Sequence, residues 1–221
     1  MDSRFKQQLL PGMFENLKEI NFGIILISTY IFFEVGSLQD ILDFVRPLKL
    51  PFAMAVMSLV YAICLLINGK FKISEHKVTH IFLVTTIYVL IYCSISTSNP
   101  QVKEVIIKLF IQYISYYIIA VASIRTLFQL VLLLDVWLVS IMHTCFHAIM
   151  QGGLLWGSSW WNDENQVSLL ASYAIPWAFV LFINYKRIMI KRICYAASIV
   201  FYVTATVISS SRGGALTMFA A

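Results

Sequence analysis

Residues 126–150 read TLFQLVLLLDVWLVSIMHTCFHAIM, and this stretch decides the class of fold. Apart from Asp135, it contains no residue that is charged at neutral pH. The hydrocarbon core of a bilayer is about 30 Å thick and takes roughly 20 apolar residues as an α-helix. The stretch therefore predicts a transmembrane helix over Thr126–Ile149.

Six further apolar runs lie on either side of this one, each bounded by charged residues, Pro or Gly. They are Asn21–Val35, Pro51–Asn68, Val78–Ser96, Glu104–Ser123, Val167–Tyr185 and Ile193–Ser209. An eighth run begins after Gly214 and reaches Ala221 before it is long enough to cross a bilayer. The sequence therefore predicts an all-α, polytopic transmembrane helix bundle with about seven complete spans and the start of an eighth, truncated at its C-terminus.

The composition of the whole chain agrees with a membrane protein. The 221 residues are 60% hydrophobic and 12% charged, with a mean hydropathy of +0.81. Soluble domains have about 25% charged residues, so the composition excludes a soluble enzyme, and a chain this apolar is not disordered. The 16 Lys and Arg outnumber the 11 Asp and Glu, but they cluster between the runs, and no nucleic-acid partner is expected.

The basic clusters also predict the orientation. Cytoplasmic loops of membrane proteins are rich in Lys and Arg, and the count favours a cytoplasmic N-terminus. Residues 1–20 then form a cytoplasmic segment, either an interfacial helix or a frayed terminus, and residues 21–221 form the transmembrane domain. This orientation places Gln151–Gln166 and Ser209–Gly214 on the same outer face, where they are candidates for one site.

In the second of these segments, Arg212 follows Ser211 and precedes Gly213 and Gly214. A guanidinium beside hydroxyls and bare backbone N–H groups is typical of a phosphate-binding turn, and a phosphate-bearing lipid fits there. A snorkelling interfacial arginine beside a flexible turn explains the same residues equally well.

The other outer segment carries Trp156, Trp160 and Trp161, followed by Asp163 and Asn165. Tryptophans at a membrane boundary form aromatic belts without any further role. Beside carboxylates and amides, they also make a surface on which a sugar stacks and its hydroxyl groups bind. Asp163 alternatively caps the helix that follows it.

Asp135 is the unusual residue of the fifth run, because an acid in the hydrocarbon layer needs a partner or a water-filled cavity. Lys108 or Arg125 are candidate partners, and a proton or ion pathway is the functional alternative. In the next run, Pro176 is expected to kink the helix.

The histidines and cysteines give weaker indications of function. His143 and His147 share one helical face, a spacing that permits two metal ligands, but no third ligand is near and no metal is predicted. The four cysteines at positions 64, 93, 145 and 194 each stand alone in an apolar run and are predicted to be small buried hydrophobic residues. The sequence has no phosphate-binding Gly-rich motif and no serine-hydrolase motif.

The outer segments together resemble the O-antigen ligase and polymerase superfamily. The resemblance covers most of the chain, and its most specific motif is the serine-arginine-glycine turn. It rests on Phe33–Pro47, Asn162-Asp163-Glu164-Asn165, Pro176, the basic loop Tyr185–Arg192 and Ser210-Ser211-Arg212-Gly213-Gly214.

The resemblance implies a multi-pass glycosyltransferase of the bacterial inner membrane. Such proteins transfer a glycan from an undecaprenyl diphosphate carrier to lipid A core, a growing polysaccharide or another acceptor, and they need no metal or cofactor. Arg212 then takes the catalytic role of binding the diphosphate, with Ser211, Gly213 and Gly214 beside it, and Asp163 or Asn165 orients an acceptor hydroxyl or a sugar. The family's histidine-bearing periplasmic loop is expected beyond Ala221, so the chain alone is expected to be inactive.

Two other functions stay open. A polytopic transporter, for example of a small anion such as bicarbonate, is compatible with Asp135 and Pro176. A truncated scaffold without catalytic activity is the third reading.

Overall fold

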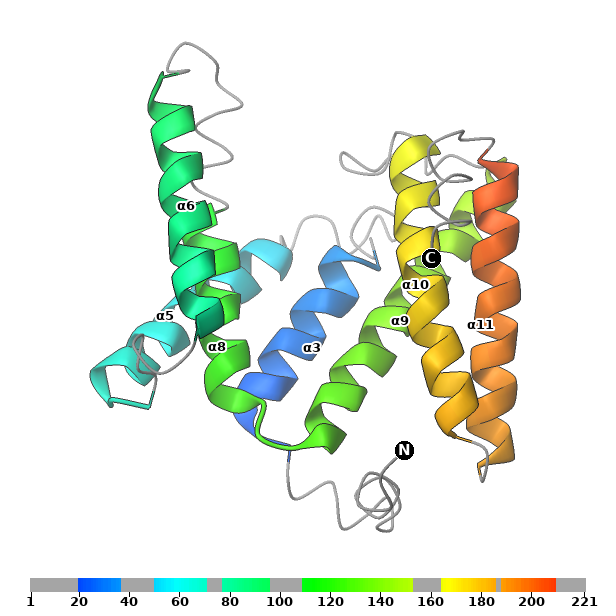
Figure 1. The fold of residues 1–221 in the computed structure, drawn as a ribbon, viewed down its shortest axis with the longest axis horizontal. Helices are drawn as coiled ribbons and strands as arrows, with labels where there is room; N and C mark the ends of the chain where they lie inside the picture. Colours follow the sequence, from blue (N-terminus) through cyan, green and yellow to red (C-terminus); the bar gives the residue numbers. More distant parts are fainter. Residues whose placement is uncertain are drawn as a thin grey trace. The chain divides into compact units, whose positions relative to one another are not determined.

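The computed structural model describes residues 20–36, 50–70, 77–95, 109–152, 164–185 and 188–209. These residues form helices and their connections, with no strand among them (Figure 1). The α-helices are α3 (Phe22–Glu34), α5 (Leu50–Ile67), α6 (Lys77–Ile95), α8 (Ser115–Ser123), α9 (Leu127–Met150), α10 (Glu164–Asn184) and α11 (Met189–Ile208). Each of the seven predicted apolar runs contains helix, which confirms the all-α class.

Three of these helices are long and apolar enough to cross a membrane: Leu127–Met150, Gln166–Asn184 and Met189–Ile208. The other apolar helical stretches, counted over fully described residues only, are shorter: Phe22–Glu34, Phe52–Ile67 and Thr79–Val89. The 13 residues of α3, for example, extend only about 20 Å at 1.5 Å per residue. The prediction of a membrane protein is thus supported by three helices, and seven complete spans are not confirmed.

The fourth predicted run differs from a single regular helix. A six-residue π-helical segment, η4 (Leu109–Ile114), leads directly into the nine-residue helix α8. A π-helical turn spaces side chains differently from an α-helix, so hydropathy alone cannot reveal it.

The chain divides into two compact units. Unit 1 comprises residues 1–27 and 51–130, and unit 2 comprises residues 28–50 and 131–221, so α3 and α9 each contribute to both.

Unit 1 is held together by close helix contacts. In α3, Gly23 faces α8 so closely that a Cβ atom there would lie 2.9 Å from the Cβ of Ser123. On the other side of α8, the ring of Tyr117 stacks on Phe82 of α6 at 4.2 Å, and its hydroxyl lies 2.8 Å from that of Thr79. Small residues at helix interfaces let backbones approach, which explains glycine at position 23.

In unit 2, α10 packs against α11, and α10 carries a stripe of small buried side chains. Ala171, Ala174 and Ala178 of α10 are fully buried, as are Ser168 and Ser172. These residues recur at helical spacing, so they form one face on which a neighbouring helix can pack closely. Pro176 lies within α10, which is assigned as one continuous helix from Glu164 to Asn184.

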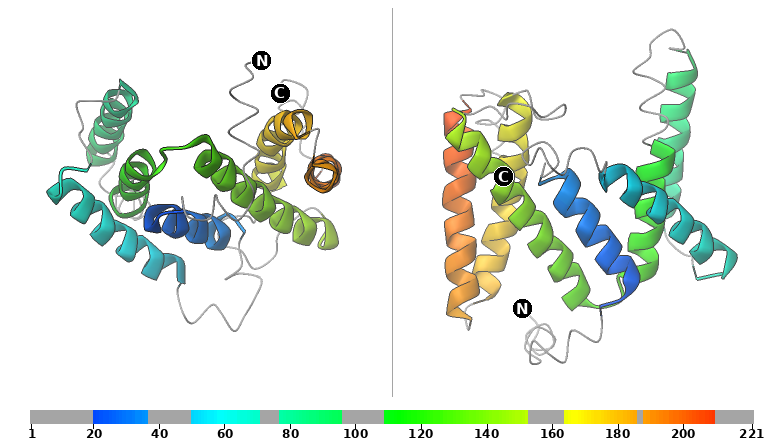
Figure 2. Two further views of the ribbon diagram at one scale, coloured as in Figure 1. Left: turned by 90° about the horizontal axis from the view of Figure 1, so that it is seen from below. Right: turned by 180° about the vertical axis from the view of Figure 1, so that it is seen from behind.

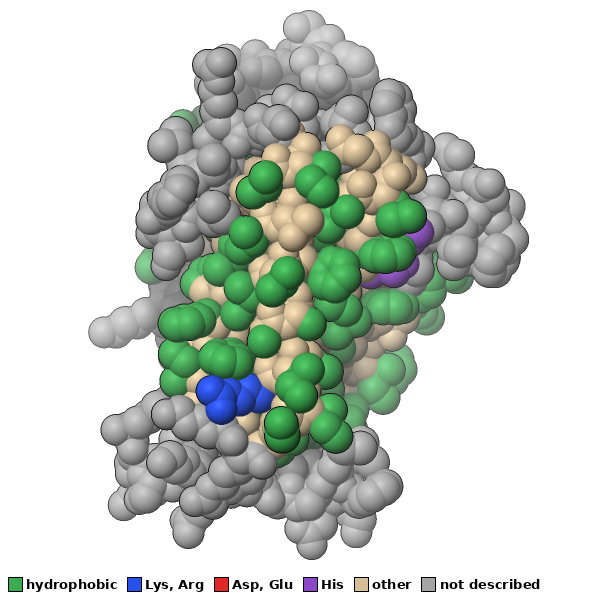
Figure 3. Space-filling view, turned by 90° about the vertical axis from the view of Figure 1, so that its right-hand side faces the viewer, with side chains coloured by type: hydrophobic (Ala, Val, Ile, Leu, Met, Phe, Trp, Pro, Cys, Tyr) green, Lys and Arg blue, Asp and Glu red, His purple; other side chains and the backbone are tan. Residues whose placement is uncertain are grey.

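The outward face of α11 is apolar over most of its length, with basic side chains near one end (Figure 3). Its large exposed hydrophobic residues are Met189, Ile190, Ile193, Val200, Val207 and Ile208. Contiguous exposure of this kind is expected where lipid, not water, is the solvent.

The cysteines only partly match their prediction. Cys145 is fully buried, but Cys64 and Cys194 are exposed, and all three are free thiols. The prediction of buried cysteines is therefore wrong for these two, because an apolar run in a membrane protein exposes one face to lipid. The side chain of Cys93 lies outside the described residues.

Candidate functional site

Most residues of the predicted site lie outside the part of the chain that the structure describes. This holds for Asp163, Ser211, Arg212, Gly213 and Gly214, and for the tryptophan loop. Asn165 lies in the first turn of α10, although its side chain is not described. Their predicted roles therefore stay predictions.

The described helix ends next to these segments do lie close in space. The C-terminal end of α9, the N-terminal end of α10 and the C-terminal end of α11 all lie at one end of unit 2 (Figures 1 and 2). Gly152, Glu164 and Ser209 are the described residues that border the undescribed parts of the two outer segments. The described helix ends that flank both segments therefore lie at the same end of the unit.

The best-defined polar cluster of unit 2 surrounds Asp135 of α9. The hydroxyl of Tyr195 donates a hydrogen bond to Oδ1 of Asp135 at 2.6 Å, and Nζ of Lys191 lies 3.5 Å from Oδ2. Both partners come from α11, four residues apart, so they project from the same face of that helix. The carboxylate thus has the charged partner that its place in an apolar helix requires.

This arrangement corrects the predicted pairing of Asp135. The ion pair is made with Lys191 of α11, not with Arg125, and Lys108 lies outside the described residues. The spacing of Lys191 and Tyr195 by one helical turn places them on one face of α11, but it does not identify Asp135 as their partner. The partner of Asp135 lies 56 positions along the chain, a pairing that depends on how the helices pack.

Tyr185, just beyond the end of α10, extends the cluster. Nζ of Lys191 lies 4.6 Å from the centre of its ring, a cation–π contact. Burial raises the pKa of Tyr185 to about 12, and the negative charge of Asp135 contributes to the shift. The phenol therefore stays protonated and neutral at physiological pH.

Two further hydrogen bonds join α9 and α11. The hydroxyl of the fully buried Tyr202 donates to the carbonyl of Leu138 at 2.7 Å, and the hydroxyl of Ser198 lies 3.5 Å from Sδ of Met142. Each buried hydroxyl thereby gains a partner, which a polar group in an apolar interior needs.

The predicted histidine pair has a structural explanation. The rings of His143 and His147 are 4.7 Å apart, but Nδ1 of His143 donates to the carbonyl of Gly36 at 2.9 Å. The neighbouring hydroxyl of Thr144 donates to the carbonyl of Val35 at 2.6 Å. These bonds satisfy carbonyl groups left open at the end of α3. Among the described residues, no three His, Cys, Asp or Glu side chains gather as metal ligands.

By these features the described part of the chain is a helical protein with three helices of membrane-spanning length. Comparisons with family models, curated proteins and solved structures found no match for it.

Proposed function

We propose that the protein is a membrane glycan transferase of the O-antigen ligase or polymerase type. Its donor is a glycan on an undecaprenyl diphosphate carrier, and its acceptor is lipid A core, a growing polysaccharide or another acceptor. The observation that supports this proposal most is the shared location of three helix ends in unit 2, next to the two segments that carry the resemblance (Figure 2).

The residue types of those segments suit this chemistry. A lipid diphosphate is an activated leaving group, so catalysis can rely on stabilising the negative charge that develops as it departs. The Arg212 guanidinium offers two parallel hydrogen bonds to phosphate oxygens, while Gly213 and Gly214 leave backbone N–H groups accessible. Asp163 and Asn165, on the other segment, supply acceptors for sugar hydroxyl groups.

The contacts between α9 and α11 help such a site by holding α11, the helix that precedes Arg212, in a fixed position relative to α9. Electrostatic catalysis needs donors that are held in place before the reaction, because reorganising them costs free energy. The bonds from Tyr195 to Asp135 and from Tyr202 to Leu138 fix the axial register of α11 against α9. The end of α11 at Ser209, three residues before Arg212, is thereby tied to a rigid pair of helices.

The test is complementation of a gene deletion in the organism that encodes the protein, with the full-length gene. Arg212→Ala should abolish transfer of the surface glycan and leave the lipid-linked precursor to accumulate. Arg212→Lys should also lose most activity, since lysine retains the charge but cannot form the bidentate contact.

The matched control is Arg192→Ala, which removes the same side chain from the other end of α11. The guanidinium of Arg192 lies 4.7 Å from the ring centre of Phe182 and has no role in the proposed site. Normal glycan display with Arg212→Ala at equal protein levels would refute the assignment. Loss of small-anion uptake with intact glycan would instead favour the transport alternative.

A further inference from the structure

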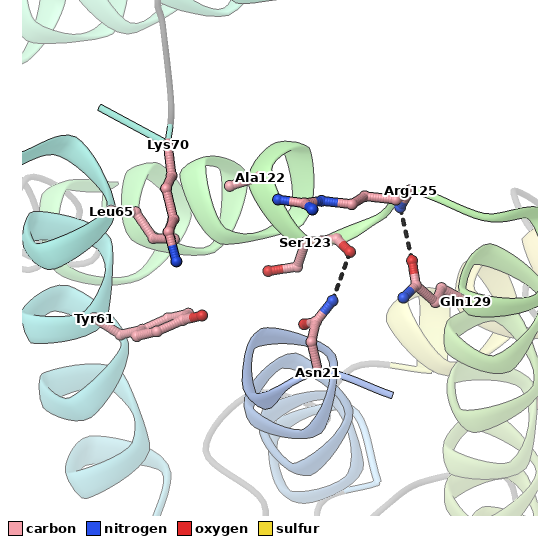
Figure 4. Close-up of a pocket in the computed structure, with 8 residues that line it drawn as sticks. All are labelled: Asn21, Tyr61, Leu65, Lys70, Ala122, Ser123, Arg125 and Gln129. Atoms are coloured by element: carbon pink, nitrogen blue, oxygen red, sulfur yellow. Dashed lines mark hydrogen bonds between the residues drawn. The ribbon is translucent and has the colours of Figure 1, made fainter. Parts of the chain in front are cut away.

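Unit 1 contains a polar cavity that the predicted site does not include. It has a volume of about 330 Å³ and lies where α3 begins, α5 ends and α8 connects to α9 (Figure 4). One water molecule occupies about 30 Å³ of liquid, so the cavity has room for a phosphate group with several waters. The lining residues are Asn21, Tyr61, Leu65, Lys70, Ala122, Ser123, Arg125 and Gln129.

Two cationic side chains extend into this cavity from different elements. Lys70 follows the end of α5, and Arg125 lies in the short connection between α8 and α9. Figure 4 shows both side chains reaching toward the space above Tyr61 and Ser123. Among the residues that the structure describes, neither cation is ion-paired with an acidic side chain.

Other polar side chains of the cavity are engaged in holding its backbone. The Asn21 side chain accepts from the amide of Ile24 at 3.1 Å and donates to the carbonyl of Ser123 at 2.8 Å. Oε1 of Gln129 accepts from the amides of Arg125 and Thr126 at 2.7 and 3.1 Å. These bonds fix the connection that carries Arg125, which preorganises its side chain for a ligand.

We propose that this cavity binds the phosphate group of an anionic phospholipid. Two converging cations, one of them a guanidinium, match the charge and geometry of a phosphate, and the Ser123 and Tyr61 hydroxyl groups can donate to its oxygens. The cavity also adjoins an apolar surface, since Leu66 and Ile67 at the end of α5 are exposed. A headgroup in the cavity thus places its acyl chains along exposed hydrophobic residues of α5.

This inference is independent of the proposed glycan transfer, because it concerns unit 1 and none of the residues near Arg212. In the orientation expected from the basic residues, Lys70 and Arg125 face the cytoplasm. There, anionic lipids attract basic residues close to the membrane surface.

The experiment measures thermal unfolding of the purified full-length protein in neutral detergent with added lipid. Phosphatidylglycerol should raise the unfolding midpoint of the wild-type protein, whereas phosphatidylcholine should not. Lys70→Gln and Arg125→Gln should each need about tenfold more phosphatidylglycerol for the same shift, because each removes one charge-assisted contact. Arg125→Lys, which retains the charge but cannot form the bidentate contact, should give a response between those of the wild type and Arg125→Gln.

Arg192→Gln is the control, since it removes an equal charge from a residue of unit 2 that does not line the cavity. An equal loss of response in Arg192→Gln, or none in the two cavity variants, would overturn the proposal. Inorganic phosphate is tested in parallel. If it alone produces the full shift at the same concentration, the cavity binds a free anion and the lipid assignment is overturned.

Discussion

The hydrogen bond from Tyr195 to Asp135 should contribute more stability than the ion pair beside it. The two contacts share one carboxylate, yet they differ in geometry and exposure. The Tyr195 hydroxyl lies 2.6 Å from Oδ1, and Tyr195 is 7% exposed. The Lys191 ammonium lies 3.5 Å from Oδ2, and its side chain is 41% exposed.

These differences set the expected magnitudes. A hydrogen bond to a charged group contributes about 1.5–3 kcal/mol, so Tyr195→Phe should lower the free energy of unfolding by that amount. An exposed ion pair contributes about 0–1 kcal/mol, so Lys191→Met should cost less. Asp135→Leu should lower the free energy of unfolding by less than Tyr195→Phe and Lys191→Met do together, because it removes the charge along with both of its contacts.

The assay is reversible unfolding of the purified protein in detergent, followed by helix content. A double-mutant cycle between Tyr195→Phe and Asp135→Leu measures the pairwise interaction, because neither replacement can form the hydrogen bond. Ser198→Ala serves as the control, because it removes a hydroxyl from the same helix face without touching Asp135. The reasoning is refuted if Lys191→Met destabilises the protein as much as Tyr195→Phe does.

Three further perturbations test the packing and the helix ends. Gly23→Ala should destabilise unit 1 by about 1–3 kcal/mol, since the new methyl group would overlap Ser123, and Ser123→Gly should restore part of the loss in thermal unfolding. Thr126→Ala should cost about 0.5–2 kcal/mol, because the Thr126 hydroxyl accepts from the Gln129 amide at 3.3 Å and caps α9; replacement by Ser should cost little. The contribution of Tyr185 to the free energy of unfolding should be constant below pH 10.0. It should fall between pH 10.0 and about 12, because the folded protein there still holds a proton that the unfolded chain has released. Comparing the tyrosinate absorbance of wild type and Tyr185→Phe across this range checks the shift, and an unshifted titration would contradict it.

Hydropathy predicted where the helices lie, because each helix in a bilayer must satisfy its own backbone and therefore needs a continuous apolar run. The fifth run, Thr126–Ile149, differs from α9 by only one residue at each end. The start of α9 is also marked by a local sequence signal that hydropathy does not detect. Thr126 and Gln129 form a capping box, with reciprocal bonds between each side chain and the other's amide, which marks the start of α9.

Hydropathy could not predict which helix faces meet. Lipid and protein neighbours are equally apolar, so the buried Ala171 and the exposed Cys64 occur in runs of similar character. The pairing of Asp135 with Lys191 was not predictable for the same reason, because it requires the packing of α9 on α11. Hydropathy also missed where two helices begin, because α10 starts at Glu164 and α11 at Met189, before the predicted starts Val167 and Ile193, and their first turns contain polar or charged residues.

Two lysines near helix ends show that helix packing can give the same residue type different roles. Lys191 lies in the first turn of α11 and Lys70 follows the end of α5. From sequence alone they are equivalent contributors to the charge bias. In unit 2, α9 brings a carboxylate to Lys191, so its charge is balanced within the protein. In unit 1, the described helices bring a second cation, Arg125, to the same cavity as Lys70. Two cations that share a cavity repel each other, and this cost is offset when an anion binds between them. The lysine with an internal partner is thus a structural residue, and the lysine beside another cation is the one whose partner is expected from outside the chain.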